Sequence, residues 1–112
     1  MKFSFSSNKF ERQLSSEKEM DKAFGHVMPT LKRRLTLLSS VACLADVPHT
    51  KPEGRHELVG DRKGHFAVWV SKNYRLIFKP DHDPVPLRAD GGFDLHAITA
   101  VKFVAIEDYH DD

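Results

Sequence analysis

The sequence predicts an α+β domain in which an N-terminal strand and two to three antiparallel helical segments pack on a small antiparallel sheet. Three observations lead to this fold class. The chain has 112 residues, 40% of them hydrophobic and 29% charged, which is the usage of a globular domain that builds its own core. Apolar residues recur at helical spacing in the first part of the chain, and alternating β-branched and aromatic residues dominate the second part. We expect residues 1–112 to form one domain.

The N-terminal part of the chain predicts one strand followed by helices. Residues 2–6 alternate polar and apolar side chains and end at a Ser-Ser-Asn cluster, as a short half-buried strand before a helix start does. From residue 10 to about residue 40, apolar side chains recur mostly every three or four positions. Ser15 and Ser16, followed by acidic residues, indicate a second helix start. Pro29 cannot donate to a helical hydrogen-bond ladder, so it predicts a kink or a new helix.

The middle of the chain predicts a loop, a turn and a hairpin. Residues 45–56 contain two prolines and a glycine and predict the loop, and residues 60–64 form a turn with a glycine at each end. The segments 65–70 and 74–79 predict the two strands of the hairpin. Alternation assigns Phe66, Val68 and Val70 to one face and Ala67 and Trp69 to the other. We expect Trp69 and the phenylalanines to lie mainly in the core.

The last part of the chain predicts a long excursion and a central strand. Residues 80–92 hold three prolines and two adjacent glycines, which favours an excursion over a tight turn. Residues 95–106 form the most apolar segment and are expected near the middle of the sheet.

Charge is distributed unevenly along the chain. Residues 1–79 carry fifteen Lys and Arg against eight Asp and Glu, and residues 80–112 carry two against eight. Such opposed halves are typical of a protein with one basic working surface, although solvated faces also differ by chance. The Lys32-Arg33-Arg34 run has the same two readings, an RNA-gripping patch or a solvated helix face.

Several classes of protein are not expected. The single cysteine, Cys43, has no partner for an internal disulfide, and no apolar run approaches the roughly 20 residues that span a bilayer. We therefore expect a cytoplasmic protein without membrane contact. The aspartates and histidines of residues 81–96 lack a recognised ligand spacing, so we expect no metal and no cofactor.

Three motifs follow one another in the second half of the chain. Residues 56–64 read His-x-Leu-x-Gly-Asp-Arg-x-Gly, residues 74–78 read Tyr-Arg-Leu-Ile-Phe, and residues 108–110 read Asp-Tyr-His. In this order and at this spacing the motifs resemble the RelE/ParE toxin superfamily, and more narrowly its HigB branch, the plasmid maintenance killer proteins.

The resemblance implies a RelE-like fold and the toxin of a type II toxin–antitoxin system. Members of the HigB branch are typically ribosome-dependent endonucleases that cleave mRNA in the decoding site. The partners implied are the ribosome, mRNA and a cognate antitoxin, which we expect to be a helix-turn-helix protein.

The residues of these motifs suit metal-free RNA cleavage. Attack of the ribose 2′-OH on the adjacent phosphate needs a group that removes one proton, a group that donates another, and cations that stabilise the phosphorane. His110 is the natural acid or base, because histidine takes either protonation state near neutral pH. Arg75 offers a planar guanidinium to phosphate. Tyr109 has a ring that stacks on a base and a hydroxyl that donates to a phosphate oxygen.

The general base stays open among Asp108, His56 and Tyr109, and Asp108 alternatively orients His110. We expect Arg62, Lys63 and Lys72 to bind RNA.

Each of these assignments has a structural alternative. Arg75 is also suited to an ion pair with Asp108 or Glu107 across the sheet. His56 is also suited to a hydrogen bond at the sheet edge, and the terminal Asp-Tyr-His motif to a solvated tail.

A second class of function is a non-catalytic protein of the same fold, either a ParE-type gyrase poison or a degenerate toxin that only binds its antitoxin. Many members of the family place a lysine where this chain has Val59, and Arg62 or Lys63 would have to replace its charge. ParE-type chains lack the terminal Asp-Tyr-His, which favours the endonuclease.

Overall fold

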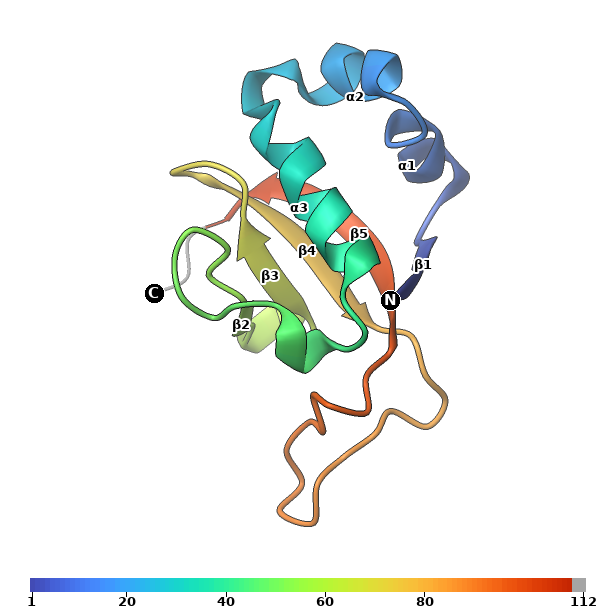
Figure 1. The fold of residues 1–112 in the computed structure, drawn as a ribbon, viewed down its shortest axis with the longest axis vertical. Coiled ribbons are helices and arrows are strands. Elements are labelled where there is room, and N and C mark those ends of the chain that lie inside the picture. The colour runs from blue at the N-terminus through green and yellow to red at the C-terminus, as the bar shows by residue number, and fades with distance from the viewer. Residues whose placement is uncertain (110–112) are drawn as a thin grey trace.

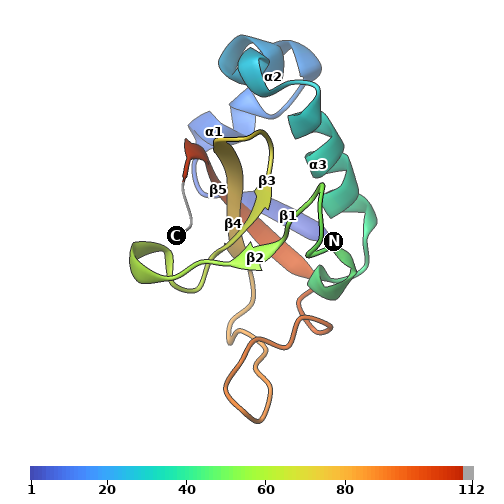
Figure 2. The ribbon, with the colours of Figure 1, turned by 90° about the vertical axis from the view of Figure 1, so that its left-hand side faces the viewer.

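The computed structural model describes residues 1–109, which form one mixed five-stranded sheet covered by helices on one face (Figures 1 and 2). The strands lie in the order β1-β5-β4-β3-β2. Their bounds are Lys2–Phe5 for β1, His56–Glu57 for β2, Phe66–Trp69 for β3, Tyr74–Pro80 for β4 and Ala100–Asp108 for β5. The α+β class and the hairpin formed by β3 and β4 are therefore confirmed.

The helices begin where the sequence predicts helix starts. Their bounds are Asn8–Gln13 for α1, Glu17–Phe24 for α2 and Thr30–Ser40 for α3, with a 3-10 turn, η1, at Gly25–Val27. The Ser7 and Ser16 hydroxyls accept from backbone N–H groups three residues on, and so satisfy two of the unpaired donors at the starts of α1 and α2. Pro29 directly precedes α3.

Helix α3 crosses one face of the sheet, and α2 lies beyond the end of the sheet (Figure 1). Leu31 and Leu38 of α3 are buried with the sheet residues Val68, Leu76 and Phe78 in the main core. Each such leucine contributes about 1.5–3 kcal/mol to folding through burial.

The structure corrects three details of the sequence-based prediction. β1 runs parallel to β5, so the sheet is not wholly antiparallel. The last strand starts at Ala100 and not at residue 95, because the backbone of Leu95 and Ile98 is bonded instead to the 3-10 turn η2 (Leu44–Asp46). Trp69 is half-buried outside the main core, with Lys51 and Arg75 over its ring.

Residues 81–99 form a long excursion that hangs from one end of the sheet (Figure 1). The His82 Nε2 atom accepts from the N–H groups of Thr99 (3.0 Å) and Ala100 (3.2 Å), which joins the two ends of the excursion. The ring of Phe93 packs on Phe66 with a centroid distance of 5.3 Å. The aspartates of this segment therefore lie at the end of β4 and β5 opposite to the Tyr74–Asp108 pair.

None of the helices in residues 1–109 is long and apolar enough to cross a membrane. In the same part of the chain, no three His, Cys, Asp or Glu side chains are grouped as metal ligands.

Candidate functional site

One face of the sheet is left uncovered by α3 (Figure 2). The strand register places several residues of the sequence motifs on this face. We call it the helix-free face. Trp69 lies opposite Arg75, and Arg75 lies opposite Glu107 on the next strand. His56 lies opposite Ala67, two residues from Trp69. Since directly opposed residues of antiparallel strands project to the same side, these five side chains share one face.

Tyr109 joins this face at the end of β5. Its backbone N–H donates to the carbonyl of Asn73 at 3.1 Å, which ties the chain after β5 to the β3–β4 turn. Its side chain packs against a small buried cluster formed by Leu58, Ala67 and Ile77. The phenol ring is thus held on the helix-free face by packing that does not involve the main core.

Arg75 is almost completely buried, with 8% of its surface exposed. Its Nη1 atom donates to the carbonyl oxygens of Ser71 (3.2 Å), Lys72 (3.3 Å) and Tyr74 (3.2 Å). The guanidinium carbon lies 5.5 Å from the centre of the Trp69 ring, a cation–π distance. Arg75 therefore holds the hairpin turn together, a role that sequence reasoning did not assign to it.

Glu107 pairs with Arg62, at 2.6 Å between carboxylate and guanidinium. Arg62 belongs to the 3-10 turn η3 (Gly60–Arg62) and reaches over the sheet to β5. The Arg75–Glu107 ion pair considered from the sequence is replaced by this contact. Two other cations expected to bind RNA, Lys63 and Lys72, are exposed on separate turns.

His56 is half-buried on β2, with its Nδ1 atom 2.8 Å from the carbonyl oxygen of Gly54. A carbonyl only accepts, so this contact requires a proton on Nδ1 and fixes the ring orientation.

Asp108 does not share the helix-free face. The register sets Asp108 opposite Tyr74, on the side of the sheet that the helices cover. Glu107 and Asp108 are neighbours in β5, so the Asp108 side chain projects to the opposite side of the sheet from Glu107 and from Arg75, which faces Glu107 across the strands. His110 lies outside the described residues.

Val59, where the resemblance found in the sequence leads us to expect a lysine, has 73% of its surface exposed. The neighbouring Arg62 is already bound to Glu107, whereas Lys63 is exposed.

The Lys32-Arg33-Arg34 run does not form one solvated face. Lys32 pairs with Glu17 at 2.6 Å. Arg34 is buried and donates to the carbonyls of Trp69 (2.7 Å) and Pro52 (3.1 Å), which joins α3 to β3 and to the preceding loop. Burial lowers the pKa of Arg34, and Glu53 partly offsets this effect. Helical periodicity alone did not reveal this role, because the two acceptors lie far away in sequence.

The structure was compared with known proteins. No protein-family model matches the sequence, and none of the curated proteins matches it. Several solved structures resemble it. The YoeB–YefM complex from Staphylococcus aureus matches with a TM-score of 0.55 and 13% identity, covering 99% of this chain and 98% of that one.

YafQ from E. coli, solved as a point mutant, matches with a TM-score of 0.55 and 20% identity over 95% of this chain and 90% of its own. A YoeB/ParE toxin from Agrobacterium tumefaciens matches with a TM-score of 0.51 and 9% identity over 98% and 100% of the two chains. At these identities the likeness concerns the fold alone. The chain has the fold of the YoeB, YafQ and ParE-type toxins, so the expected RelE-like fold is confirmed.

Proposed function

We propose that residues 1–112 form a single toxin domain of a type II toxin–antitoxin system, HigB-like in its motifs, that cleaves mRNA on the translating ribosome. The observation that carries the proposal is the gathering of His56, Arg75 and Tyr109 on the helix-free face. These residues come from three separate motifs of the sequence, and a face that collects them offers an RNA strand one continuous surface.

The proposed chemistry is metal-free. One group removes the proton of a ribose 2′-OH, the oxygen attacks the adjacent phosphorus, and the bond to the 5′ oxygen breaks as a second group protonates that oxygen. His110 is assigned to one of the two proton transfers and Tyr109 to the phosphate or the neighbouring base. His56 is the candidate for the other proton transfer. Asp108, which the register turns to the helix-covered side of the sheet, is assigned only to orienting His110.

Cations supply the remaining part of the chemistry. The buried guanidinium of Arg75 provides fixed positive charge on the same face of the sheet as Tyr109, and such pre-arranged charge stabilises the phosphorane without reorganisation. Lys63, Lys72 and Arg62 are assigned to the RNA backbone. A phosphate that displaces Glu107 from Arg62 would gain a charge-assisted contact in exchange.

The partners proposed are the ribosome, mRNA and a cognate antitoxin, with a cytoplasmic location. The matching YoeB structure is a complex with YefM, which supports a protein partner for this fold.

The test is primer extension on a reporter mRNA in a translating extract. The chain has two tyrosines, so Tyr109→Phe has a matched control in Tyr74→Phe on the other side of the sheet. We expect wild type and Tyr74→Phe to cut only when ribosomes translate. We expect His110→Ala, shown to be folded by circular dichroism, to lose cleavage by a factor on the order of 10²–10⁴. We expect Tyr109→Phe, also shown to be folded, to lose the hydroxyl that donates to the phosphate and with it a factor on the order of 10²–10³.

A second candidate function is favoured by the exposed Val59 and by the likeness to a YoeB/ParE toxin. If the wild type leaves mRNA intact but stops growth, the endonuclease proposal is wrong. Inhibition of DNA gyrase in a supercoiling assay would then support the ParE-type reading.

A further inference from the structure

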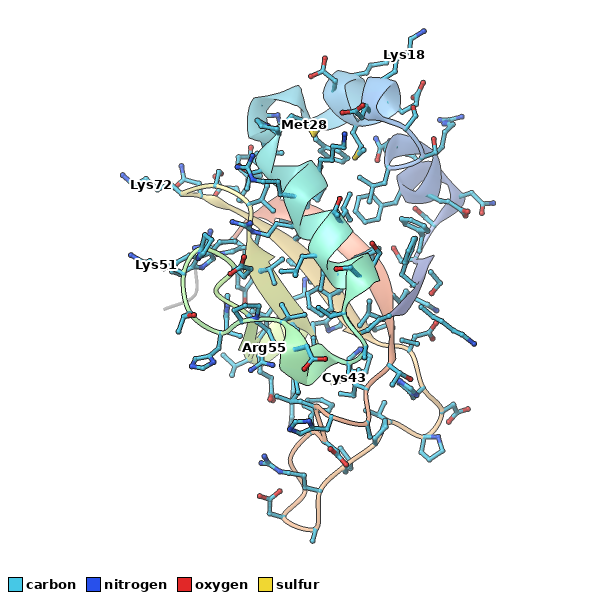
Figure 3. The ribbon with its side chains drawn as sticks, in the orientation of Figure 1. Lys18, Met28, Cys43, Lys51, Arg55 and Lys72 are labelled. Carbon is cyan, nitrogen blue, oxygen red and sulfur yellow. The ribbon has the colours of Figure 1, made fainter. Side chains whose placement is uncertain are left out.

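A pocket of about 640 Å³ opens beside the outer edge of β3. It lies between the start of α3, the loop before β2 and the β3–β4 turn. Its floor is Trp69, and five cations line its walls: Arg33, Arg34, Lys51, Lys72 and Arg75. Figure 3 shows Lys51 and Lys72 projecting from two separate loops toward the same side of the molecule. We call this region the basic pocket.

The positive charge of the basic pocket is not neutralised by the residues that line it. No Asp or Glu is among those residues. Within residues 1–109, none of the four cations other than Arg75 has a carboxylate at ion-pair distance. Glu53 acts on Arg34 through space and is the acid whose charge offsets the burial of that guanidinium. An anion that enters the pocket therefore meets the exposed charges of Arg33, Lys51 and Lys72, which have no carboxylate at ion-pair distance within residues 1–109.

The cations are held in place by the tertiary structure. The Lys51 Nζ atom lies 5.6 Å and the Arg75 guanidinium carbon 5.5 Å from the centre of the Trp69 ring. The backbone of Gly54 packs directly on the same indole, since a Cβ there would stand 2.8 Å from its Cδ2 atom. Trp69 is thereby fixed, and it positions two of the five charges.

The donors divide into two sets. Arg34 and Arg75 donate hydrogen bonds to backbone carbonyls and form the buried wall of the pocket. Arg33, Lys51 and Lys72 are exposed and bring charge that a ligand can reach. Such a concave group of cations with a buried arginine wall suits phosphate, which accepts several donors at once.

Trp69 and Arg75 belong both to the basic pocket and to the helix-free face. The two regions therefore adjoin at Trp69 and Arg75. We propose that the basic pocket binds a backbone phosphate of single-stranded RNA that flanks the segment held on the helix-free face. The inference rests on the proposed function for the path of the strand, but it concerns binding and not cleavage.

The test measures binding of a fluorescein-labelled 2′-O-methyl hexanucleotide, which lacks the 2′-OH that cleavage needs. Anisotropy gives the affinity of the full chain. Quenching of Trp69, the single tryptophan, reports RNA at the indole that the basic pocket shares with the helix-free face, and loss of quenching in the pocket variant locates that RNA in the pocket. The pocket variant is Arg33→Gln/Lys51→Gln. The control variant is Lys9→Gln/Lys18→Gln, which removes two exposed charges from α1 and α2.

We expect the pocket variant to bind on the order of tenfold more weakly than wild type, and the slope of log K against log salt to fall by about 1.4 for two lost contacts. The control variant should bind like wild type. A poly-glutamate peptide of equal length should not compete.

Equal binding by the pocket variant and wild type would overturn the inference, as would equal loss in both double variants or competition by poly-glutamate. Failure of cleavage with retained binding and Trp69 quenching would remove the endonuclease proposal and leave the basic pocket intact. The two proposals therefore fail separately.

Discussion

Arg75 shows how one side chain serves both the fold and the candidate site. Its Nη1 atom bonds three carbonyls of the hairpin turn, and its guanidinium lies against Trp69. The charge offered to phosphate is thus held rigid by the same contacts that close the turn. A substitution at this position changes stability as well as chemistry, so activity of an Arg75 variant has to be read together with its folding.

Arg75→Gln should lower the free energy of unfolding by about 1–3 kcal/mol, because three partly buried hydrogen bonds from a charged donor to the carbonyls of the turn are lost. Lys72→Gln removes an exposed charge from the same turn and should change the free energy of unfolding by less than about 0.5 kcal/mol. Urea unfolding followed by circular dichroism measures both. Equal stability of the two variants would contradict the claim that the hydrogen bonds of Arg75 stabilise the turn.

The loop before β2 and the strand β3 act as one unit at the scale of elements. The backbone N–H of Trp69 donates to the carbonyl of Glu53 at 2.8 Å. Arg34 of α3 donates to carbonyl oxygens of both the loop and β3. β2 is only two residues long, so its pairing with β3 ends early. The loop before β2 then bonds to the rest of β3 along the same edge of the sheet. The close approach of loop and strand depends on a glycine at position 54.

Gly54→Ala and Gly60→Ala make a matched pair. Both glycines have positive φ (59° and 66°), so each alanine carries a backbone cost of about 1–2 kcal/mol. At Gly60 a Cβ meets nothing within 4 Å, whereas at Gly54 it would stand 2.8 Å from the Trp69 indole. We expect Gly54→Ala to lower the free energy of unfolding by about 1–3 kcal/mol more than Gly60→Ala does, and to shift the Trp69 emission.

Thermal unfolding and tryptophan emission spectra test this pair. Equal losses in the two variants, with unchanged emission, would contradict direct packing of Gly54 on Trp69.

At the scale of the whole molecule, the fold separates positive from negative charge. The basic pocket and the helix-free face lie toward the β3–β4 turn, whereas the acidic excursion of residues 81–99 leaves the opposite end of the sheet. Within the excursion, Asp90 accepts from the N–H of Gly92 and from Arg88, and these two hydrogen bonds lower the pKa of its carboxyl group. Because it leaves the sheet at the end opposite to the β3–β4 turn, this acidic segment lies away from the surface proposed to bind RNA.

Removing negative charge should affect RNA binding only on the helix-free face. Asp83→Asn/Asp94→Asn in the excursion should change the affinity for the 2′-O-methyl hexanucleotide by less than about twofold at an ionic strength near 0.15 M, because screening acts over about 8 Å. Glu107→Gln should strengthen binding several-fold, since it frees Arg62 from its ion pair. Fluorescence anisotropy measures both, and stronger binding in the excursion variant would contradict this separation of charge.

The sequence by itself determined the local features of this protein. Serine caps, proline at a helix start and the alternation of residues 66–70 are encoded by neighbours along the chain, and the caps, the start of α3 and the hairpin agree with them. The motif residues His56, Arg75 and Tyr109 were also identified from the sequence, and the sheet register brings them to one face.

Only the tertiary structure decided how distant segments meet. The parallel pairing of β1 with β5 joins residues almost a hundred positions apart, and no local pattern encodes a partner at that range. The same holds for the Arg62–Glu107 pair, for the burial of Arg34 and for the basic pocket, whose walls come from α3, the loop before β2 and the hairpin. Periodicity tells which side of an element is apolar, whereas the partner of a charge depends on the packing of all the elements together.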